Sequence, residues 1–157
     1  MPEILTDLQI AQLIGDPKPL PPDWRRRLAP RPKRGHTEAE LQVRGAAGGL
    51  FRLILRRSLH NPLDFSVILA FVDPESGRNF RLRRYSGKSH EHTNPLESER
   101  FYDCHVHRAT ERYQRSGNRE DTFAVAASAF ATMEQALELV IAEGAFAEPV
   151  DPPAPLL

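Results

Sequence analysis

The chain has 157 residues, of which 40% are hydrophobic and 27% charged; this fits one folded domain and excludes an intrinsically disordered chain. The formal net charge of zero excludes a uniformly basic or acidic protein, and no apolar run reaches the roughly 20 residues that a membrane helix needs. The start, MPEILTDLQI, lacks a signal-peptide pattern, and the single cysteine, Cys104, has no disulfide partner within the chain, so we expect a cytoplasmic protein with no membrane partner.

The first 35 residues are predicted to form a short helix and a linker. Thr6 with Gln9 matches a capping box and Gly15 suits a helix end, so residues 6–15 should be helical. Residues 16–35 contain six prolines and seven basic residues, a composition typical of an extended or irregular segment. We expect Trp24 to anchor this segment to the domain.

The folded unit is predicted to span residues 36–145. Alternating or continuous apolar patterns predict strands at 38–44, 51–59, 65–72 and 80–83, separated by turn-forming segments. Residues 132–143 carry an apolar stripe at helical spacing and end at Gly144. The predicted fold is therefore α+β: an antiparallel meander of four to six strands with the C-terminal helix on one face. Residues 146–157 are predicted to be a flexible proline-rich tail.

Charge is unevenly distributed along the chain. Residues 50–119 contain 13 Lys/Arg and 8 Asp/Glu, whereas the C-terminal part is acidic. An excess of positive charge in the middle of the chain is compatible with a polyanionic partner and also with an ordinary solvated surface.

The segment from Tyr85 to Gln114 concentrates four of the six histidines. If residues 101–107 form one strand, Asp103, His105 and His107 share a face, and an extended segment at 89–93 would put His90 and His92 on one face as well. Imidazole and carboxylate groups are ligands for divalent metals such as Zn²⁺, Mn²⁺ or Fe²⁺. The sequence therefore nominates a divalent-metal site made of His90, His92, Asp103, His105 and His107, provided that the two His-x-His pairs meet.

A metal-free chemistry uses the same segment. A histidine with a near-neutral pKa is a general acid or base, and a nearby cation stabilises a phosphate; the candidate catalytic residues are His105, His107 and Glu111. The candidate binding residues share a cationic or aromatic side chain suited to a phosphate or a base. They are Lys88, Arg100, Arg108, Arg112, Arg52, Arg56, Arg81, Arg83 and Tyr85.

Several runs in this region resemble the signature of a family of small uncharacterised bacterial proteins. The runs are Tyr85–Asn94 (YSGKSHEHTN), Glu99–Tyr102 (ERFY), His105–His107 (HVH) and Ala109–Gln114 (ATERYQ), and the resemblance extends over residues 51–114 and the terminal helix. It implies a prokaryotic cytoplasmic protein and assigns no activity or catalytic residue.

Three functions are compatible with the sequence. The first is binding of RNA or DNA through an arginine- and histidine-rich sheet face. The second is a phosphodiesterase or nuclease, either metal-dependent or based on histidine alone. The third is an adaptor that binds another protein. No sequence motif identifies a substrate or an oligomeric state.

Overall fold

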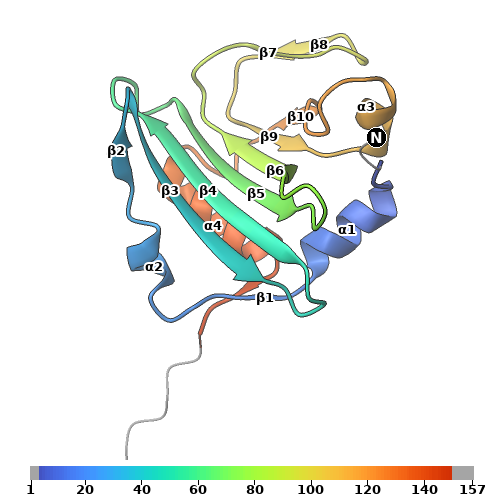
Figure 1. The fold of residues 1–157 in the computed structure, drawn as a ribbon. Coiled ribbons are helices and arrows are strands. Elements are labelled where there is room, and N and C mark those ends of the chain that lie inside the picture. Colours follow the sequence, from blue (N-terminus) through green and yellow to red (C-terminus); the bar gives the residue numbers. More distant parts are fainter. Residues whose placement is uncertain (1–3, 150–157) are drawn as a thin grey trace, which may run out of the picture.

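A computed structural model describes residues 4–149 of the chain as an α+β fold. Its main sheet has seven strands in the order β10-β9-β6-β5-β4-β3-β2, with every neighbouring pair antiparallel (Figure 1). The prediction of an antiparallel sheet with a terminal helix is confirmed, although the sheet is larger than the four to six strands expected. The strands beside the four long ones are short: β2 (Arg31–Lys33) and β10 (Ala124–Ala126) form the two edges, and β9 (His105–Arg108) lies between β6 and β10.

Four long strands form the predicted meander: β3 (His36–Arg44), β4 (Leu50–Ser58), β5 (Phe65–Val72) and β6 (Asn79–Ser86). Successive side chains of a strand point to opposite faces of the sheet, and residues opposite each other in a ladder point to the same face. Leu53 pairs with Leu69 in the buried core, whereas Arg56 pairs with Ser66 on the other face.

A β-bulge interrupts the pairing of β5 with β6. Leu69 pairs with Arg83, but the next residue, Ala70, pairs with Arg81, so Leu82 is an extra residue in β6. The bulge reverses the alternation expected for β6. As a result Arg83 lies on the core side of the sheet, where it approaches Glu143, and Arg84 takes its place on the opposite face.

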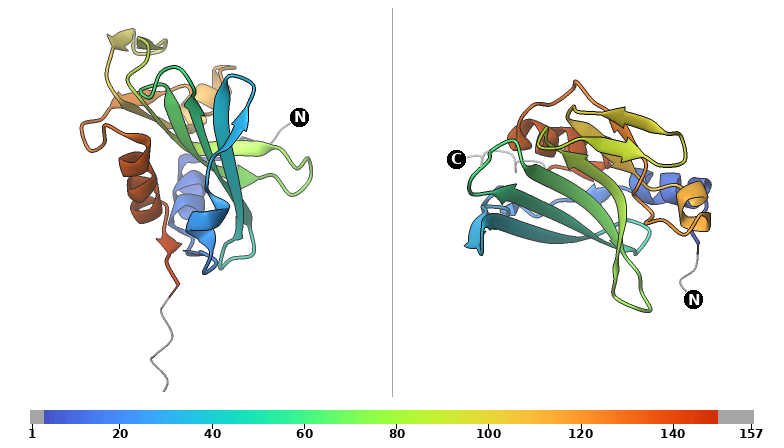
Figure 2. Two further views of the ribbon diagram at one scale, coloured as in Figure 1. Left: turned by 90° about the vertical axis from the view of Figure 1, so that its left-hand side faces the viewer. Right: turned by 90° about the horizontal axis from the view of Figure 1, so that it is seen from above.

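Helix α4 (Met133–Glu143) covers the core face of the sheet, as predicted. Thr132 caps it by accepting the backbone N–H of Gln135, and its apolar stripe buries Met133, Ala136 and Val140. Seen edge-on in Figure 2, α4 lies on one side of the sheet only. The short strand β11 (Phe146–Ala147) follows it; residues 150–157 of the expected tail lie outside the described residues.

The N-terminal segment belongs to the same core, so the predicted boundary at residue 35 does not separate two packing units. It contains α1 (Asp7–Gly15), β1 (Lys18–Pro19) and α2 (Trp24–Arg27), and β1 pairs in parallel with β11. The capping box of α1 and the burial of Trp24 are confirmed. Lys18 is fully buried, with its Nζ within 2.9 Å of four backbone carbonyls, including that of Gly144. None of the helices in residues 4–149 is long and apolar enough to cross a membrane.

Between β6 and β9 the chain forms a separate hairpin of β7 (His92–Asn94) and β8 (Glu99–Phe101), drawn at the top of Figure 1 beside β9 and β10. Its turn is tied to α3 (Glu111–Arg115): the hydroxyl of Tyr113 accepts the backbone N–H of Leu96 at 3.3 Å and donates to the Glu97 carboxylate. The chain leaves β6 for this hairpin at Gly87, whose N–H donates to the carbonyl of Phe65.

Gly87→Ala is expected to destabilise the fold at the origin of the hairpin. An added Cβ would lie 2.0 Å from the carbonyl oxygen of Leu63 and 2.6 Å from the ring of Phe65, and backbone atoms cannot yield as a flexible side chain does. We expect a loss of about 2–3 kcal/mol in the free energy of unfolding, measured by urea denaturation. The matched control is Gly15→Ala, where nothing lies within 4 Å and helix propensity predicts a gain of up to about 1 kcal/mol. Equal urea midpoints for the two variants would contradict the close approach of Gly87 to Leu63 and Phe65.

Candidate metal centre

His105 and His107 lie on the sheet face that α4 does not cover. Ladder pairing sets His105 opposite Ser86 and His107 opposite Arg84, while Val106 between them pairs with Tyr85 and joins the core. Both imidazoles are buried, with 0% and 3% of their surface exposed. This is the alternation that the His-x-His pattern predicts for a strand.

The prediction of one continuous strand over residues 101–107 is wrong. Strand β8 ends at Phe101 and β9 begins at His105, because the chain turns between them to bring the hairpin back to the sheet. The side chain of Asp103 is exposed and contributes no ligand atom to the histidine cluster; its backbone carbonyl lies 2.8 Å from His105 Nδ1.

His92 of the hairpin meets the two histidines of β9, so one member of the first His-x-His pair comes together with both members of the second. One ring nitrogen from each of His92, His105 and His107 lies within 4.8 Å of the others. The ring centroids are 5.3 Å apart for His92 and His105, and 4.8 Å apart for His107 and each of the other two. These three residues are hereafter the histidine cluster. The ring of Phe101 packs against His92 and His105.

Each ring of the histidine cluster has one nitrogen beside an oxygen acceptor. His105 Nδ1 lies 2.8 Å from the Asp103 carbonyl, and His107 Nδ1 lies 2.8 Å from the Asp121 carbonyl. A carbonyl only accepts, so both Nδ1 atoms carry the proton, and in the neutral ring Nε2 keeps a lone pair. Metal-binding histidines in proteins are commonly oriented by such bonds from the second ring nitrogen.

Asn94 orients the third ring and fastens the hairpin to the sheet. It is buried, donates from Nδ2 to the carbonyl of Ala124 at 2.7 Å and accepts the N–H of Ala124 at 2.9 Å. These two hydrogen bonds to β10 define which end of the Asn94 amide is the oxygen. Because Oδ1 also lies 2.8 Å from His92 Nε2, that nitrogen is the donor and His92 Nδ1 keeps the lone pair.

The histidine cluster thus presents three imidazoles, each with one nitrogen hydrogen-bonded to an oxygen acceptor and the other nitrogen left for a ligand. The Nε2 atom of His105 is buried and has no hydrogen-bond partner in the described structure. Burying an acceptor without a donor is costly, and a cation held by the lone pairs would remove that cost. Imidazole nitrogens suit Zn²⁺, Fe²⁺, Ni²⁺ or Cu²⁺, and three protein ligands with one open position are typical of catalytic zinc.

Burial decides the protonation state of both β9 histidines. It lowers the pKa of His107 to about 2, with further lowering by Arg84 and the neighbouring imidazoles. Burial is also the main cause that lowers the pKa of His105. A histidine with such a pKa stays neutral at pH 7 and offers a lone pair, which a metal ligand requires, instead of exchanging protons.

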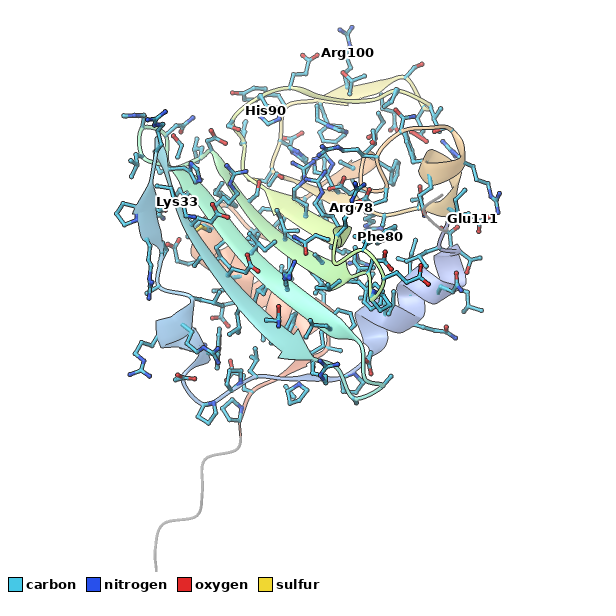
Figure 3. All side chains as sticks on the ribbon, viewed as in Figure 1. Lys33, Arg78, Phe80, His90, Arg100 and Glu111 are labelled. Atoms are coloured by element: carbon cyan, nitrogen blue, oxygen red, sulfur yellow. The ribbon has the colours of Figure 1, made fainter. Side chains whose placement is uncertain are left out.

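His90 and Glu111 lie outside the histidine cluster. His90 is exposed, its Nδ1 is 2.9 Å from the hydroxyl of Ser89, and its ring centroid is 6.1 Å from that of His105. Glu111 lies on α3, where it pairs with Arg115 at 2.7 Å, and Figure 3 shows it away from His90. The structure therefore does not bring Glu111 to His105 and His107 as a third catalytic group.

Four arginines lie on the sheet face beside the histidine cluster, and we call them the arginine face: Arg52, Arg56, Arg81 and Arg84. This corrects the predicted set, in which Arg83 stood where Arg84 lies. The prediction that Tyr85 stacks on a base is also wrong, because Tyr85 is 1% exposed in the core and offers no surface to a base. The buried carboxylate of Asp121 pairs with Arg81 at 3.2 Å and Arg84 at 3.1 Å.

The other predicted cations are dispersed. Lys88 is exposed near the ring of Tyr102, Arg100 pairs with Glu91 and points outward from the hairpin (Figure 3), and Arg112 pairs with Glu97 on α3. Arg108 lines a pocket with residues of α1. They do not converge with the arginine face into a single patch.

Sequence reasoning missed three residues of the site: Arg84, Asn94 and Asp121. A signal existed for Asn94 alone, because it follows His92 by two positions and so shares its face in a strand. The chain matches no protein-family model, no curated protein and no solved structure. The resemblance noted for residues 51–114 therefore stays a prediction.

The metal-free protein is expected to lose stability as pH falls below about 6.5. In the unfolded chain both β9 histidines regain a pKa near 6.5 and take up protons at a higher pH than the folded state does. Stability therefore rises with pH: His107 alone accounts for about 1.4 kcal/mol between pH 5.5 and 7.5, and His105 adds to the difference in the same direction.

This pH dependence is measured by urea denaturation in the presence of a chelator. His107→Gln should remove at least about half of the difference in the free energy of unfolding between the two pH values, because the imidazole with the more strongly lowered pKa is gone. His60→Ala changes an exposed histidine in the β4–β5 loop and should leave the difference intact. An unchanged pH dependence in His107→Gln would contradict a neutral, buried His107.

Proposed function

We propose that this protein is a metal-dependent phosphodiesterase or nuclease whose metal is held by His92, His105 and His107. The observation that carries the proposal is the histidine cluster itself: two buried imidazoles and one half-buried imidazole, each oriented by an oxygen acceptor. Three acceptor nitrogens offer one another no proton, so a cation stabilises their arrangement better than neutral rings alone. A bound divalent metal supplies Lewis acidity and a nucleophilic hydroxide at neutral pH.

Phosphodiesters are the substrate class that the surrounding charges favour. Arg84 is the cross-strand neighbour of His107, and Asp121 accepts its Nε–H at 3.1 Å, which holds the guanidinium beside the histidine cluster. Its terminal NH₂ groups provide further donors for phosphate oxygens. Arg56 extends the arginine face across β4 and has no carboxylate within 4.0 Å in residues 4–149.

Purified protein is expected to bind one Zn²⁺ or Mn²⁺ and to cleave single-stranded RNA, single-stranded DNA or bis(p-nitrophenyl) phosphate. Alanine in place of His92, His105 or His107 should weaken metal binding at least tenfold, about 1.4 kcal/mol, and abolish cleavage. Isothermal titration calorimetry measures the affinity, and circular dichroism confirms that each variant folds.

The matched control for the metal experiment is His60→Ala, an exposed histidine outside the histidine cluster. It should retain both metal and activity. Metal binding without cleavage would contradict the proposed phosphodiesterase activity but would still support the metal centre. Full activity in the presence of a chelator would contradict metal dependence.

Polynucleotide binding through the arginine face is tested by salt. For three phosphate contacts to a single strand, affinity should fall about 20-fold between 50 and 200 mM salt, measured by fluorescence anisotropy. Arg56→Gln should weaken binding and reduce the salt dependence. The control is Arg25→Gln, because Arg25 pairs with Glu138 of α4 on the other side of the sheet. Salt-independent binding, or equal loss in both variants, would contradict this role of the arginine face.

A further inference from the structure

Ser86 lies next to the histidine cluster on the same face of the sheet. It is the last residue of β6 and pairs with Ser66 of β5 on one side and with His105 of β9 on the other. Residues directly opposite each other in a ladder have Cβ atoms about 4.5–5.5 Å apart. Ser86 is 4% exposed, so its hydroxyl is almost completely removed from solvent.

Two neighbouring polar atoms in this place lack partners. The hydroxyl of Ser86 and the Nε2 of His105 are both buried and form no hydrogen bond in the described structure, and the other such atom, on Thr37, belongs to β3. Native proteins rarely leave buried polar groups unsatisfied without a functional reason or a bound group between them. A serine hydroxyl both donates and accepts, whereas the lone pair of His105 only accepts.

We propose that Ser86 is a positioning residue for an exchangeable water in the fourth coordination position of the metal. This rests on the proposed metal centre and deepens it. The metal binds the lone pair of His105, and its water hydrogen-bonds to the Ser86 hydroxyl, which satisfies both unpartnered atoms at once. Three histidines with an open, water-filled position make a catalytic site; a fourth protein ligand would make a closed structural site.

His90 is the competing fourth ligand. Its ring lies 6.1 Å from that of His105, but it is exposed and its Nδ1 is engaged with Ser89. Ser86 and His105, by contrast, are held opposite each other by the β6–β9 ladder, so their relative position does not depend on a loop. The geometry therefore favours water over His90.

The experiment uses the full chain loaded with Co²⁺, whose visible spectrum reports ligand number and the ionisation of a bound water. Ser86→Ala should bind Co²⁺ within about threefold of wild type, because no metal ligand is lost. The pH midpoint of the spectral change should rise by about 0.5–1 unit, since the hydroxyl no longer hydrogen-bonds to the hydroxide. Ser86→Thr keeps a hydroxyl and should restore the midpoint.

Ser66→Ala is the matched control, because Ser66 is the neighbour of Ser86 on the side away from His105; it should titrate like wild type. An identical midpoint in Ser86→Ala and wild type would overturn the role of Ser86 while leaving the metal centre in place. A tenfold loss of Co²⁺ affinity in His90→Ala, with a changed spectrum, would make His90 the fourth ligand and overturn the open position. Wild type that binds no Co²⁺ would overturn both proposals.

Discussion

The histidine cluster depends on the paired hydrogen bonds between Asn94 and Ala124. The hairpin that carries His92 forms no ladder with the main sheet, and Asn94 takes the place of one by bonding both backbone groups of a residue in the edge strand β10. The same amide oxygen receives the N–H of His92. One buried side chain thus positions the hairpin and forms hydrogen bonds with free backbone groups at the edge of β10. It also selects the tautomer of His92, a candidate metal ligand.

Asp121 has the corresponding role on the sheet side of the site. Its carbonyl accepts the N–H of His107, and its buried carboxylate holds Arg81 and Arg84. A buried carboxylate is tolerated because two guanidinium groups surround it, and the guanidinium of Arg84 is in turn fixed next to the imidazoles. The arginine face is therefore better understood as a set of oriented hydrogen-bond donors than as a surface of excess positive charge.

The long elements were predictable because their patterns are local. The capping residues Thr6 and Thr132, the alternation of β4 and the continuous apolar run of β5 need only backbone geometry and burial to be interpreted. The bulge at Leu82 was not predictable in this way. Alternation alone put Leu82 and Arg83 on opposite faces, whereas the extra residue in β6 reverses the pattern and sends Tyr85 into the core.

By itself the sequence determined the class of fold, the terminal helix and the alternating pair His105 and His107, because hydrophobic period and strand geometry act over neighbouring residues. Only the tertiary structure decided that His92 joins this pair, that His90, Asp103 and Glu111 do not, and that Arg84 stands beside the site. These outcomes depend on where the hairpin folds back and on the register of β6 against β5 and β9. Both are set by contacts between residues far apart in the chain, which no local pattern encodes.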